Sequence, residues 1–388
     1  MKRFWPCIVV LVAGIFWCTS GPAAGSANDF PTTPATHNGQ KWRIGYLEGG
    51  PYANYPANLR ALVDALSDLG WLQKPDMPPA EDPNDTQNLW AWLAQNVKSD
   101  FLRFAPDAYW SAGWDKERRK AVQSAVLERL NGQKDIDLML AMGTWAGQDL
   151  ANDRHHVATV VISTSDPLRS KIIKSIDDSG YDHLNARVDP TRYERQVRIF
   201  HDIFHFKKLG VVLEENTVDG RTYAAIDDVK RVADDLGFEV ITCDAPFSNV
   251  SDEQAQQAVL ACHRKLAPQI DALYLTVHRG ATLEMIQQLL EPMYARKIPV
   301  FSQRGTDEVR RGALLSIARA GFKYVARFHA ETIAKIFNGA KPRDLDQVFE
   351  DPPRIAINLK AAQIIGYDPP VDILGSADEV FKEIPPAP

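Results

Sequence analysis

The stretch LGVVLEENTVDGRTYAAIDDVKRVADDLGFEVIT, residues 209–242, carries the pattern on which the fold class depends. It begins with an apolar run at 209–213, passes through a segment of helical periodicity around 222–236, and ends in a second apolar run at 238–242. Short apolar runs separated by an amphipathic helix are typical of parallel strands that are buried between helices. The stretch therefore predicts a strand, a helix and a second, parallel strand.

The same alternation occurs on both sides of this stretch. Toward the C-terminus we expect strands at 272–276 and 300–302, with helices around 252–266 and 282–296. The first of these helices opens with Ser251 and Gln254, which have the spacing of a capping box. Toward the N-terminus we expect a helix that ends at Gly70 and strands at 42–47, 136–141 and 157–163. Such a series predicts an α/β fold with doubly wound parallel sheets.

An interruption in the series indicates two sheets, and so two lobes joined by hinge strands. Between Pro167 and Pro190 the chain is rich in Ser, Asp and Gly and has no clear period. By analogy with two-lobed folds, we expect the chain to cross between lobes near 166–170, near 303–305 and after Gly339. After a polar leader at 28–40, the expected N-terminal lobe comprises 41–166 and 305–340, and the C-terminal lobe 167–304 and about 341–380.

The N-terminus has the pattern of a cleavable secretory signal. Two basic residues precede an apolar run that is too short to span a bilayer comfortably, and small residues follow it up to Ala27. This pattern predicts a signal peptide at 1–27 and a periplasmic mature protein. Lipoprotein processing at Cys18 is the alternative, but Phe16 and Trp17 stand where that processing needs small residues.

The composition excludes several classes of partner. The formal net charge is −6, and loss of the two basic residues of the signal takes it to −8. We therefore expect no nucleic-acid partner and no attraction to an anionic membrane surface. Roughly 360 residues remain after cleavage, which is enough for two domains of ordinary size.

Two cysteines, Cys243 and Cys262, lie in the mature chain, and export permits them to pair. Cys243 ends a predicted strand, and Cys262 lies about ten residues into the helix that follows. Ten helical residues carry the chain roughly 15 Å back from the strand end. A disulfide needs Cα atoms within about 7 Å of each other, so we predict two buried free thiols.

An ordered set of short motifs resembles one protein family. The motifs are Ile44-Gly45-Tyr46-Leu47, Leu69-Gly70-Trp71, Gly143-Thr144, Ser165-Asp166-Pro167, Ile298-Pro299-Val300-Phe301, Gly312-Ala313-Leu314, Phe337 to Pro342, and Ile357 to Ala362 followed by Gly366. Together they resemble the ABC-transporter substrate-binding family that includes tryptophan and aromatic amino-acid binders, a branch of the type I periplasmic binding proteins. The resemblance spans nearly the whole mature chain. It implies a receptor that closes two lobes on a small ligand and delivers it to a membrane permease.

Three departures from the family pattern lie in or near the expected cleft. Residues 49–56 replace the His-Pro that follows the first strand in the family, and Glu214-Glu215-Asn216 replaces its usual polar loop. Extra sequence between about Lys74 and Lys120 carries Trp90, Trp92, Trp110 and Trp114. We expect this insertion to form a helical pair packed on the first lobe, with a lid or a docking surface as the alternative. The aromatic amino-acid ligand of the family is not carried over to this chain.

The first lobe offers candidate ligand-binding residues after its strands. Ligands of open parallel sheets bind at the carboxyl ends of the strands, where helix N-termini favour an anionic group. This rule selects Thr144, Trp145, Ser165 and Asp166, with Tyr52 as a further wall. The Thr144 hydroxyl can donate a hydrogen bond, Asp166 can hold an ammonium group, and the rings can stack on the ligand. Helix or turn capping and ordinary packing are the alternatives.

The facing lobe offers Glu215, Asn216, His278, Arg279 and Arg304 at strand ends. Arg279 and Arg304 suit a carboxylate or a phosphate, because a guanidinium can pair with either in a bidentate manner. A surface or hinge ion pair is the alternative for each. The ligand predicted from these residues is small, polar or amphipathic, and amino-acid-like or carboxylate-bearing.

The sequence gives no positive reason to propose catalysis. His201 and His205 have a metal-ligand spacing on a helix, but Asp202 stands where a zinc hydrolase has Glu, and no third ligand is evident. No nucleophile elbow, phosphate loop or cysteine signature occurs. We predict a protein that is not an enzyme and that needs no cofactor and no metal.

Two kinds of function remain compatible with these patterns. The favoured one is a monomeric receptor of an ABC importer, whose partners are a small-molecule ligand and a membrane permease. The alternative is a module of the same fold that presents its ligand to a membrane kinase or chemoreceptor. An exported hydrolase is a third and weaker hypothesis, which conversion of the ligand into a product would support.

Overall fold

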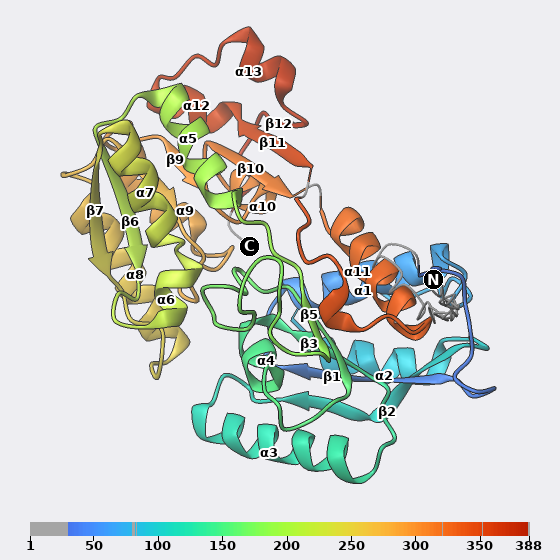
Figure 1. Ribbon diagram of the computed structural model, residues 1–388. Coiled ribbons are helices and arrows are strands. Elements are labelled where there is room, and N and C mark those ends of the chain that lie inside the picture. The colour runs from blue at the N-terminus through green and yellow to red at the C-terminus, as the bar shows by residue number, and fades with distance from the viewer. Residues whose placement is uncertain (1–29, 80–81, 83, 320, 351, 387–388) are drawn as a thin grey trace, which may run out of the picture.

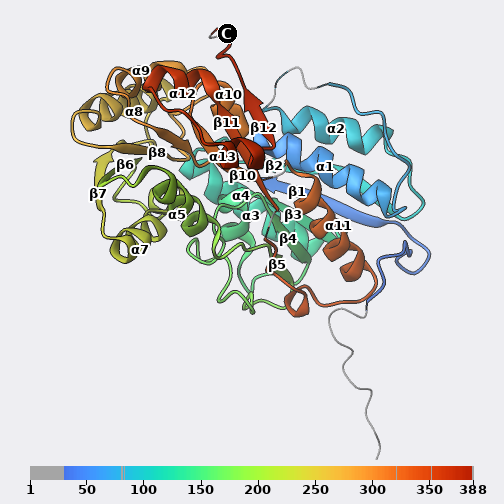
Figure 2. The ribbon, with the colours of Figure 1, turned by 90° about the horizontal axis from the view of Figure 1, so that it is seen from above.

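The computed structural model describes residues 30–79, 82, 84–319, 321–350 and 352–386. They form two lobes, each built on one sheet (Figures 1 and 2). The predicted signal peptide, including Cys18, lies outside the described residues. Within the described part of the chain, no helix is long and apolar enough to cross a membrane.

The first lobe contains a sheet of parallel strands in the order β2-β1-β3-β4-β5. The strands are β1 (Trp42–Glu48), β2 (Leu102–Ser111), β3 (Leu138–Met142), β4 (Ala158–Ile162) and β5 (Leu184–Ala186). The helices are α1 (Asn54–Asp68), α2 (Thr86–Asn96), α3 (Lys116–Gly132), α4 (Gly143–Leu150) and α11 (Lys323–Phe337), with the short 3-10 helix η1 (Pro342–Asp344) beside β5. Helices α1, α2 and α11 pack on one face, and α3 and α4 on the other. The sequences of β3 and β4, which are apolar except for Thr159, predict this two-sided burial.

The second lobe contains a sheet in the order β12-β11-β10-β9-β8-β6-β7. Its strands are β6 (Lys208–Leu213), β7 (Glu239–Asp244), β8 (Ala272–Leu275), β9 (Val300–Ser302), β10 (Leu315–Arg319), β11 (Pro353–Asn358) and β12 (Glu379–Phe381). Its helices are α5 (Arg192–Phe204), α6 (Val218–Tyr223), α7 (Ile226–Leu236), α8 (Asp252–Leu266), α9 (Ile286–Tyr294), α10 (Thr306–Arg310), α12 (Leu359–Ile365) and α13 (Val371–Ser376). All neighbouring strands are parallel except β10 and β11. Between these two strands the chain visits the first lobe through α11 and returns in the opposite direction.

The chain crosses between the lobes later than the sequence predicted. Strand β5 pairs with β4 in the first sheet, so the first crossing lies after it and not near 166–170. Strand β10 pairs with β9 in the second sheet, so the second crossing lies between β10 and α11 and not near 303–305. The third follows Val348, which pairs with Val188 beside the first crossing. The first crossing was misplaced because β5 has only three residues, too few to show a period after a long loop.

The tryptophan-rich insertion is not a helical pair. It contains the helix α2, the edge strand β2, which pairs with β1, and only the beginning of α3. Pro106 and Asp107 interrupt the alternation of β2 at the place where its register with β1 shifts, which hides the strand in the sequence. Trp90 is fully buried, and its indole Nε1 donates to the Ala105 carbonyl at 2.9 Å. The insertion thus packs on the first lobe as expected, but by extending its sheet.

Cys243 and Cys262 form a disulfide with their Cα atoms 5.6 Å apart, so the prediction of two free thiols is wrong. The connection from β7 to α8, residues 245–251, carries the chain beyond the strand end before the helix turns back. The helical residues before Cys262 then return the chain to the level of Cys243 and not past it. The bond ties the edge strand β7 to the helix that covers it.

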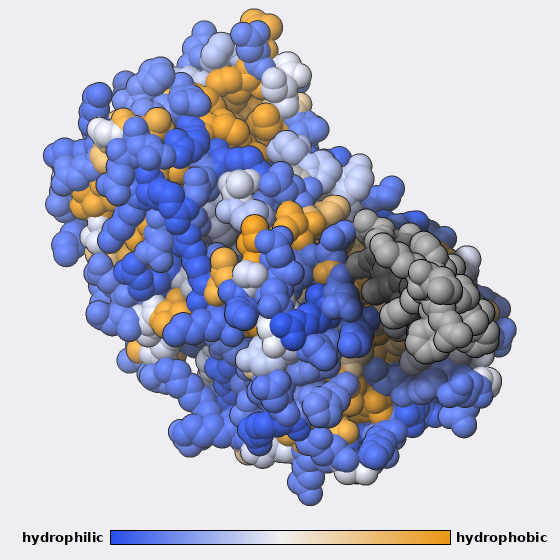
Figure 3. Space-filling model, viewed as in Figure 1, coloured by the Kyte–Doolittle hydropathy of each residue, from blue (hydrophilic) through white to orange (hydrophobic). Residues whose placement is uncertain are grey.

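The face of the molecule in Figure 3 is mostly hydrophilic. Apolar surface gathers at the end of the second lobe where Figure 1 places α12 and α13. These helices carry Ile364 and Val371, two of the exposed large apolar side chains. Other apolar side chains form buried clusters on both faces of each sheet, and their burial stabilises each lobe.

Candidate functional site

The candidate site lies where the two lobes meet. In the first lobe, β3 leads directly into α4, which begins with the buried residues Gly143, Thr144 and Trp145. The second lobe faces them with α6, which follows β6 and contains Asp219 and Tyr223. The indole Nε1 of Trp145 donates a hydrogen bond to Oδ2 of Asp219 at 2.9 Å. The carboxyl edge of the first sheet, which the sequence selected, therefore contacts the second lobe directly.

Gly143 allows the chain to turn from β3 into α4 against a tyrosine. Its φ is +86°, in the left-handed region. A Cβ atom at this position would lie 1.8 Å from the hydroxyl oxygen of Tyr55. Tyr55 is buried in α1, and its ring lies edge-on to that of Tyr52 with centroids 5.3 Å apart. Only glycine combines this φ with so close an approach.

Two hydroxyl groups meet at the ends of β3 and β4. The Oγ1 atoms of Thr144 and Thr164 are 3.4 Å apart, and both side chains are buried. The Tyr223 side chain of the second lobe lies near Thr144, and burial raises the pKa of its phenol, which therefore stays neutral. Ser163, which follows β4, has a φ of +62° and accepts a hydrogen bond from Asn58 at 3.4 Å. Left-handed backbone at a non-glycine residue is frequent at ligand sites.

Trp145 is held from several sides within its own lobe. The guanidinium of Arg119, in α3, lies 4.6 Å from the centroid of the indole. The ring of Trp114 lies edge-on to it with centroids 5.4 Å apart. Gly49, after β1, lies against both indoles and leaves no room for a Cβ atom. The structure thus places the predicted residue Trp145 at the seam between the lobes, with one ring face beside Arg119 and its N–H donated to the second lobe.

Arg304 is the predicted cation that lies at the seam between the lobes. Its Nη1 atom donates to the Ala281 carbonyl at 3.1 Å and pairs with Glu308 at 3.3 Å. Its Nε and Nη2 atoms have no hydrogen-bond partner among the described residues, and the side chain is 19% exposed. Tyr52, from the first lobe, lies near this guanidinium. This leaves a donor edge that suits a carboxylate.

Ser165 and Asp166 lie in a loop that contacts the second lobe. The Asp166 carboxylate accepts from the backbone N–H groups of Leu168 at 2.9 Å and Arg169 at 3.0 Å, which is the capping role considered as its alternative. Arg169 in turn pairs across the seam with Asp228 of α7 at 2.6 Å. The Ser165 carbonyl accepts from the Tyr193 hydroxyl of α5 at 3.3 Å. The Ser165 carbonyl thus contacts the second lobe directly, whereas Asp166 fixes the loop whose Arg169 makes the other contact.

Among the described residues, the other predicted residues of the second lobe have their hydrogen-bond and ion-pair partners within that lobe. His278 is buried between the Ala245 carbonyl and the Gly280 N–H, at 2.9 and 3.0 Å. Arg279 donates to the Val250 carbonyl and pairs with Asp252 at 3.2 Å. Glu215 uses its backbone N–H to bind Asp244, and Asn216 is exposed. These contacts join loops of one lobe and do not involve the first lobe.

Several residues at or near the seam between the lobes were not predicted from the sequence. Asp219 and Tyr223 follow β6, so the carboxyl-end rule selects their segment, but the pattern predicted only the helix around 222–236 there. Glu214, and not Glu215, is the buried carboxylate of the adjoining loop, where it accepts from Ser248 Oγ at 2.6 Å. Nothing in the sequence distinguishes Arg119 from other charged helical residues, most of which are exposed.

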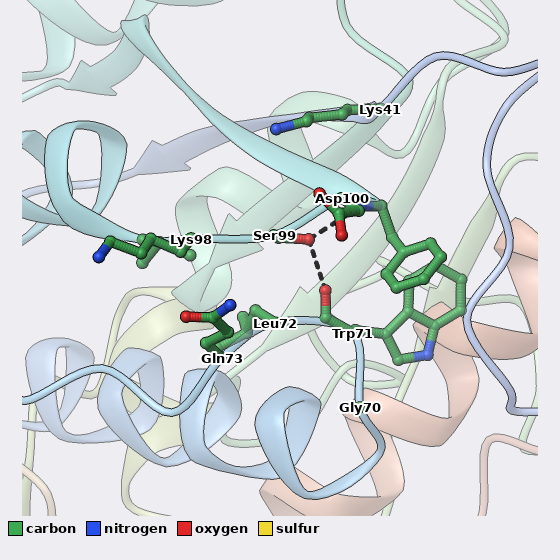
Figure 4. Close-up of a pocket in the computed structure, with 10 residues that line it drawn as sticks. Lys41, Gly70, Trp71, Leu72, Gln73, Lys98, Ser99 and Asp100 are labelled. Atoms are coloured by element: carbon green, nitrogen blue, oxygen red, sulfur yellow. Dashed lines mark hydrogen bonds between the residues drawn. The ribbon is translucent and has the colours of Figure 1, made fainter.

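A separate cavity of about 480 Å³ lies at the opposite, amino edge of the first sheet (Figure 4). Lys41, Trp71 and Lys98 are among its lining residues. Its Ser99 hydroxyl donates to the Trp71 carbonyl at 2.6 Å and accepts from the N–H groups that open β2. Within the described parts of the chain, no group of three or more His, Cys, Asp or Glu is placed to hold a metal ion.

A pair of buried histidines at the end of α4 gives the fold a pH dependence. The Nε2 atoms of His155 and His183 both bind the Leu150 carbonyl, at 3.0 and 3.2 Å. Burial lowers the pKa of His155 from 6.5 to about 4 and also lowers that of His183. As the pH falls, the unfolded chain therefore takes up protons at a higher pH than the folded chain does. The stability that the two neutral histidines contribute is present above pH 6.5 and is lost as the pH falls toward 4.

We expect His155→Gln to lose this pH dependence while its amide N–H keeps the bond to the Leu150 carbonyl. The stability difference between wild type and variant should shrink by about 1.4 kcal/mol per pH unit between pH 6.5 and 4.5. Urea denaturation of both proteins across this range measures it, and the comparison cancels the other titrating groups. A difference that is constant with pH would show that His155 titrates alike in both states.

Comparisons with known proteins agree with this geometry. The sequence model of the family described as "ABC transporter substrate binding protein" matches residues 112–381. No protein of curated function matches the chain in sequence.

Three solved structures have similar folds, and in each comparison the match covers 88% of this chain and 100% of the other. They are the ABC domain of Streptococcus pneumoniae in complex with L-Trp (18% identity, TM-score 0.66), a conserved domain protein of Vibrio cholerae (19%, 0.64), and the ligand-free, open form of a substrate-binding protein with adhesive properties from Clostridium difficile (17%, 0.60). At these identities the likeness shows a shared two-lobed fold.

Proposed function

The chain belongs to the ABC transporter substrate-binding protein family, and on this premise we propose that it is the periplasmic receptor of an importer and closes its lobes on one small, carboxylate-bearing ligand. The observation that supports this ligand class is the guanidinium of Arg304, whose Nε and Nη2 atoms lack hydrogen-bond partners among the described residues. A carboxylate can accept from both atoms at once, and such charge-assisted pairs are strong and directional.

The contacts across the seam support closure as the mechanism. Arg304 belongs to the second lobe, whereas Tyr52 and Thr144 belong to the first. A ligand that binds all three contacts both lobes only when they are closed, and it therefore shifts the equilibrium toward the closed form. We propose that this form docks on a membrane permease and releases its ligand unchanged, and that the protein acts as a monomer exported by the signal at 1–27.

A thermal-shift screen of the mature protein against amino acids and small carboxylates tests the proposal. A ligand present at ten times its dissociation constant is expected to add about 1.4 kcal/mol of stability. Titration calorimetry should then give one site per chain, and mass spectrometry should recover the ligand chemically unchanged. A converted ligand would instead indicate an exported hydrolase, and a screen without any binder would remove the support for a receptor.

Arg304→Gln is expected to weaken binding of the carboxylate ligand tenfold to a hundredfold. The variant loses a charge-assisted hydrogen bond, which contributes about 1.5–3 kcal/mol. Arg264→Gln is the matched control, because Arg264 is exposed on α8 and should leave affinity unchanged. Equal affinities of wild type and Arg304→Gln would place the carboxylate somewhere else.

A further inference from the structure

The hydrogen bond between Trp145 and Asp219 joins the two lobes beside the candidate site. We infer that this pair is a latch that favours the closed form, and that Arg119 is the residue that positions the latch tryptophan. The inference rests on the proposed function, because closure matters only if the lobes open to admit a ligand.

The chemistry of the pair makes it specific to the closed form. An indole N–H can only donate, and an ionised carboxylate can only accept. The two atoms are 2.9 Å apart, and Trp145 is 8% exposed. When the lobes separate, both groups must form their hydrogen bonds with water instead. The bond therefore forms only on closure, and it needs no ligand.

Arg119 fixes the indole and its backbone at the same time. Its Nη2 atom donates to the Trp145 carbonyl at 3.2 Å and to Oε1 of Gln148 at 2.9 Å. Its Nε atom donates to both carboxylate oxygens of the buried Asp149, at 2.9 and 3.1 Å. The same guanidinium lies over the indole at 4.6 Å. One side chain of α3 thus holds the first two turns of α4 and the ring that reaches the other lobe.

Asp219 is the matching half of the latch in the second lobe. It lies in the first turn of α6, whose N-cap Thr217 accepts from the Gly220 N–H at 3.0 Å and fixes the start of the helix. Gly220 lies against the Glu214 carbonyl, where a Cβ atom would be 2.1 Å from the oxygen. The carboxylate is therefore carried on a helix start with little freedom to move, opposite an indole that is equally constrained.

Electron-spin distance measurements test the latch without any ligand. Labels are placed at Glu128 on α3 and Asp234 on α7, which are exposed and belong to different lobes. We expect Trp145→Phe, which keeps an aromatic ring but lacks the N–H, to raise the ratio of open to closed molecules about tenfold, since a hydrogen bond to a charged group is lost. Asp219→Ala should do the same from the other lobe, and it keeps the test valid if Trp145→Phe fails to fold.

Arg119→Met separates positioning from simple support of the fold. A residue that only supports α3 against α4 would lower stability and leave the lobe distances unchanged. A positioning residue opens the lobes as Trp145→Phe does, and combining the two changes opens them no further. Arg119→Lys, which keeps a cation near the ring, should restore part of the closure, and Arg118→Met on the exposed face of α3 is the matched control.

The outcomes are distinct from those of the proposed function. Unchanged distances in both Trp145→Phe and Asp219→Ala would overturn the latch, even if a ligand binds. Opening in those variants but not in Arg119→Met would overturn the role of Arg119. A ligand screen without any binder would leave the ligand-free distances readable, and so would contradict the receptor proposal alone.

Discussion

Replacing Gly143 by alanine is expected to lower the free energy of unfolding by about 3 kcal/mol. The new Cβ atom would lie 1.8 Å from the hydroxyl oxygen and 2.7 Å from Cζ of Tyr55, so helix α1 or the start of α4 must shift. The φ of +86° adds strain that any side chain other than hydrogen would feel. Because Thr144 follows directly, the shift should also weaken ligand binding. Urea denaturation and calorimetric titration measure the two effects.

Gly237→Ala separates strain from overlap. Gly237 has a similar φ of +75°, but a Cβ atom there would meet nothing within 4 Å. We expect it to lose only about 1 kcal/mol, which is the backbone part of the effect. Adding Tyr55→Phe to Gly143→Ala removes the overlapping oxygen and should recover part of the loss. Equal losses in the two glycine variants would contradict the close approach of Tyr55 to Gly143.

Replacing both Cys243 and Cys262 by alanine is expected to lower the free energy of unfolding by about 3 kcal/mol. The disulfide closes a loop between residues 19 apart in the sequence. Cross-linking a loop of this size restricts the unfolded chain by about that amount. The bond also anchors the edge strand β7, next to the loop whose Ala245 carbonyl binds the buried His278.

Guanidinium denaturation of the oxidised protein and of the double variant checks this expectation. Wild type treated with a reductant should unfold at the same denaturant concentration as the double variant. Identical midpoints for oxidised wild type and variant would show that the disulfide is absent from the purified protein or does not stabilise it. Ligand affinity provides a second readout, and it should change little because the bond lies at the outer edge of the second lobe.

Local sequence patterns predicted the elements that do not depend on distant contacts. The predicted strand at 300–302 and the helix at 252–266 have the observed bounds of β9 and α8. The capping box of Ser251 and Gln254 is formed in both directions. Buried parallel strands are recognisable because they are apolar throughout, and helix ends because capping uses few residue types.

Features that depend on the path of the chain between elements could not be predicted in this way. The helical rise used to argue against the disulfide was correct. The argument failed because residues 245–251 first carry the chain outward from the end of β7, which the sequence did not reveal. The crossings were misplaced because the loop before β5 has no period that distinguishes it from a hinge. Strand β2 was hidden by Pro106, which breaks the alternation that marks a strand.

The sequence predicted candidate residues of the first lobe but not the residues that contact them from the second lobe, because these contacts also depend on the path of the chain. The carboxyl-end rule selected Thr144 and Trp145, which lie at the carboxyl edge of the first sheet, where this edge meets the second lobe. It could not name their partners, because Trp145 and Asp219 lie 74 residues apart and come together only through the packing of one lobe against the other. Arg304 and Arg279 looked alike in the sequence, and only the structure shows that Arg279 is engaged within its own lobe.

Calorimetric titration of wild type and Arg304→Gln with a carboxylate ligand and with its uncharged amide tests the proposed function most directly. We predict that wild type binds the carboxylate at least about tenfold more tightly than the amide, and that Arg304→Gln binds both alike, since a charge-assisted pair contributes about 1.5–3 kcal/mol. The same preference for the carboxylate in both proteins would contradict a ligand held at the seam by Arg304.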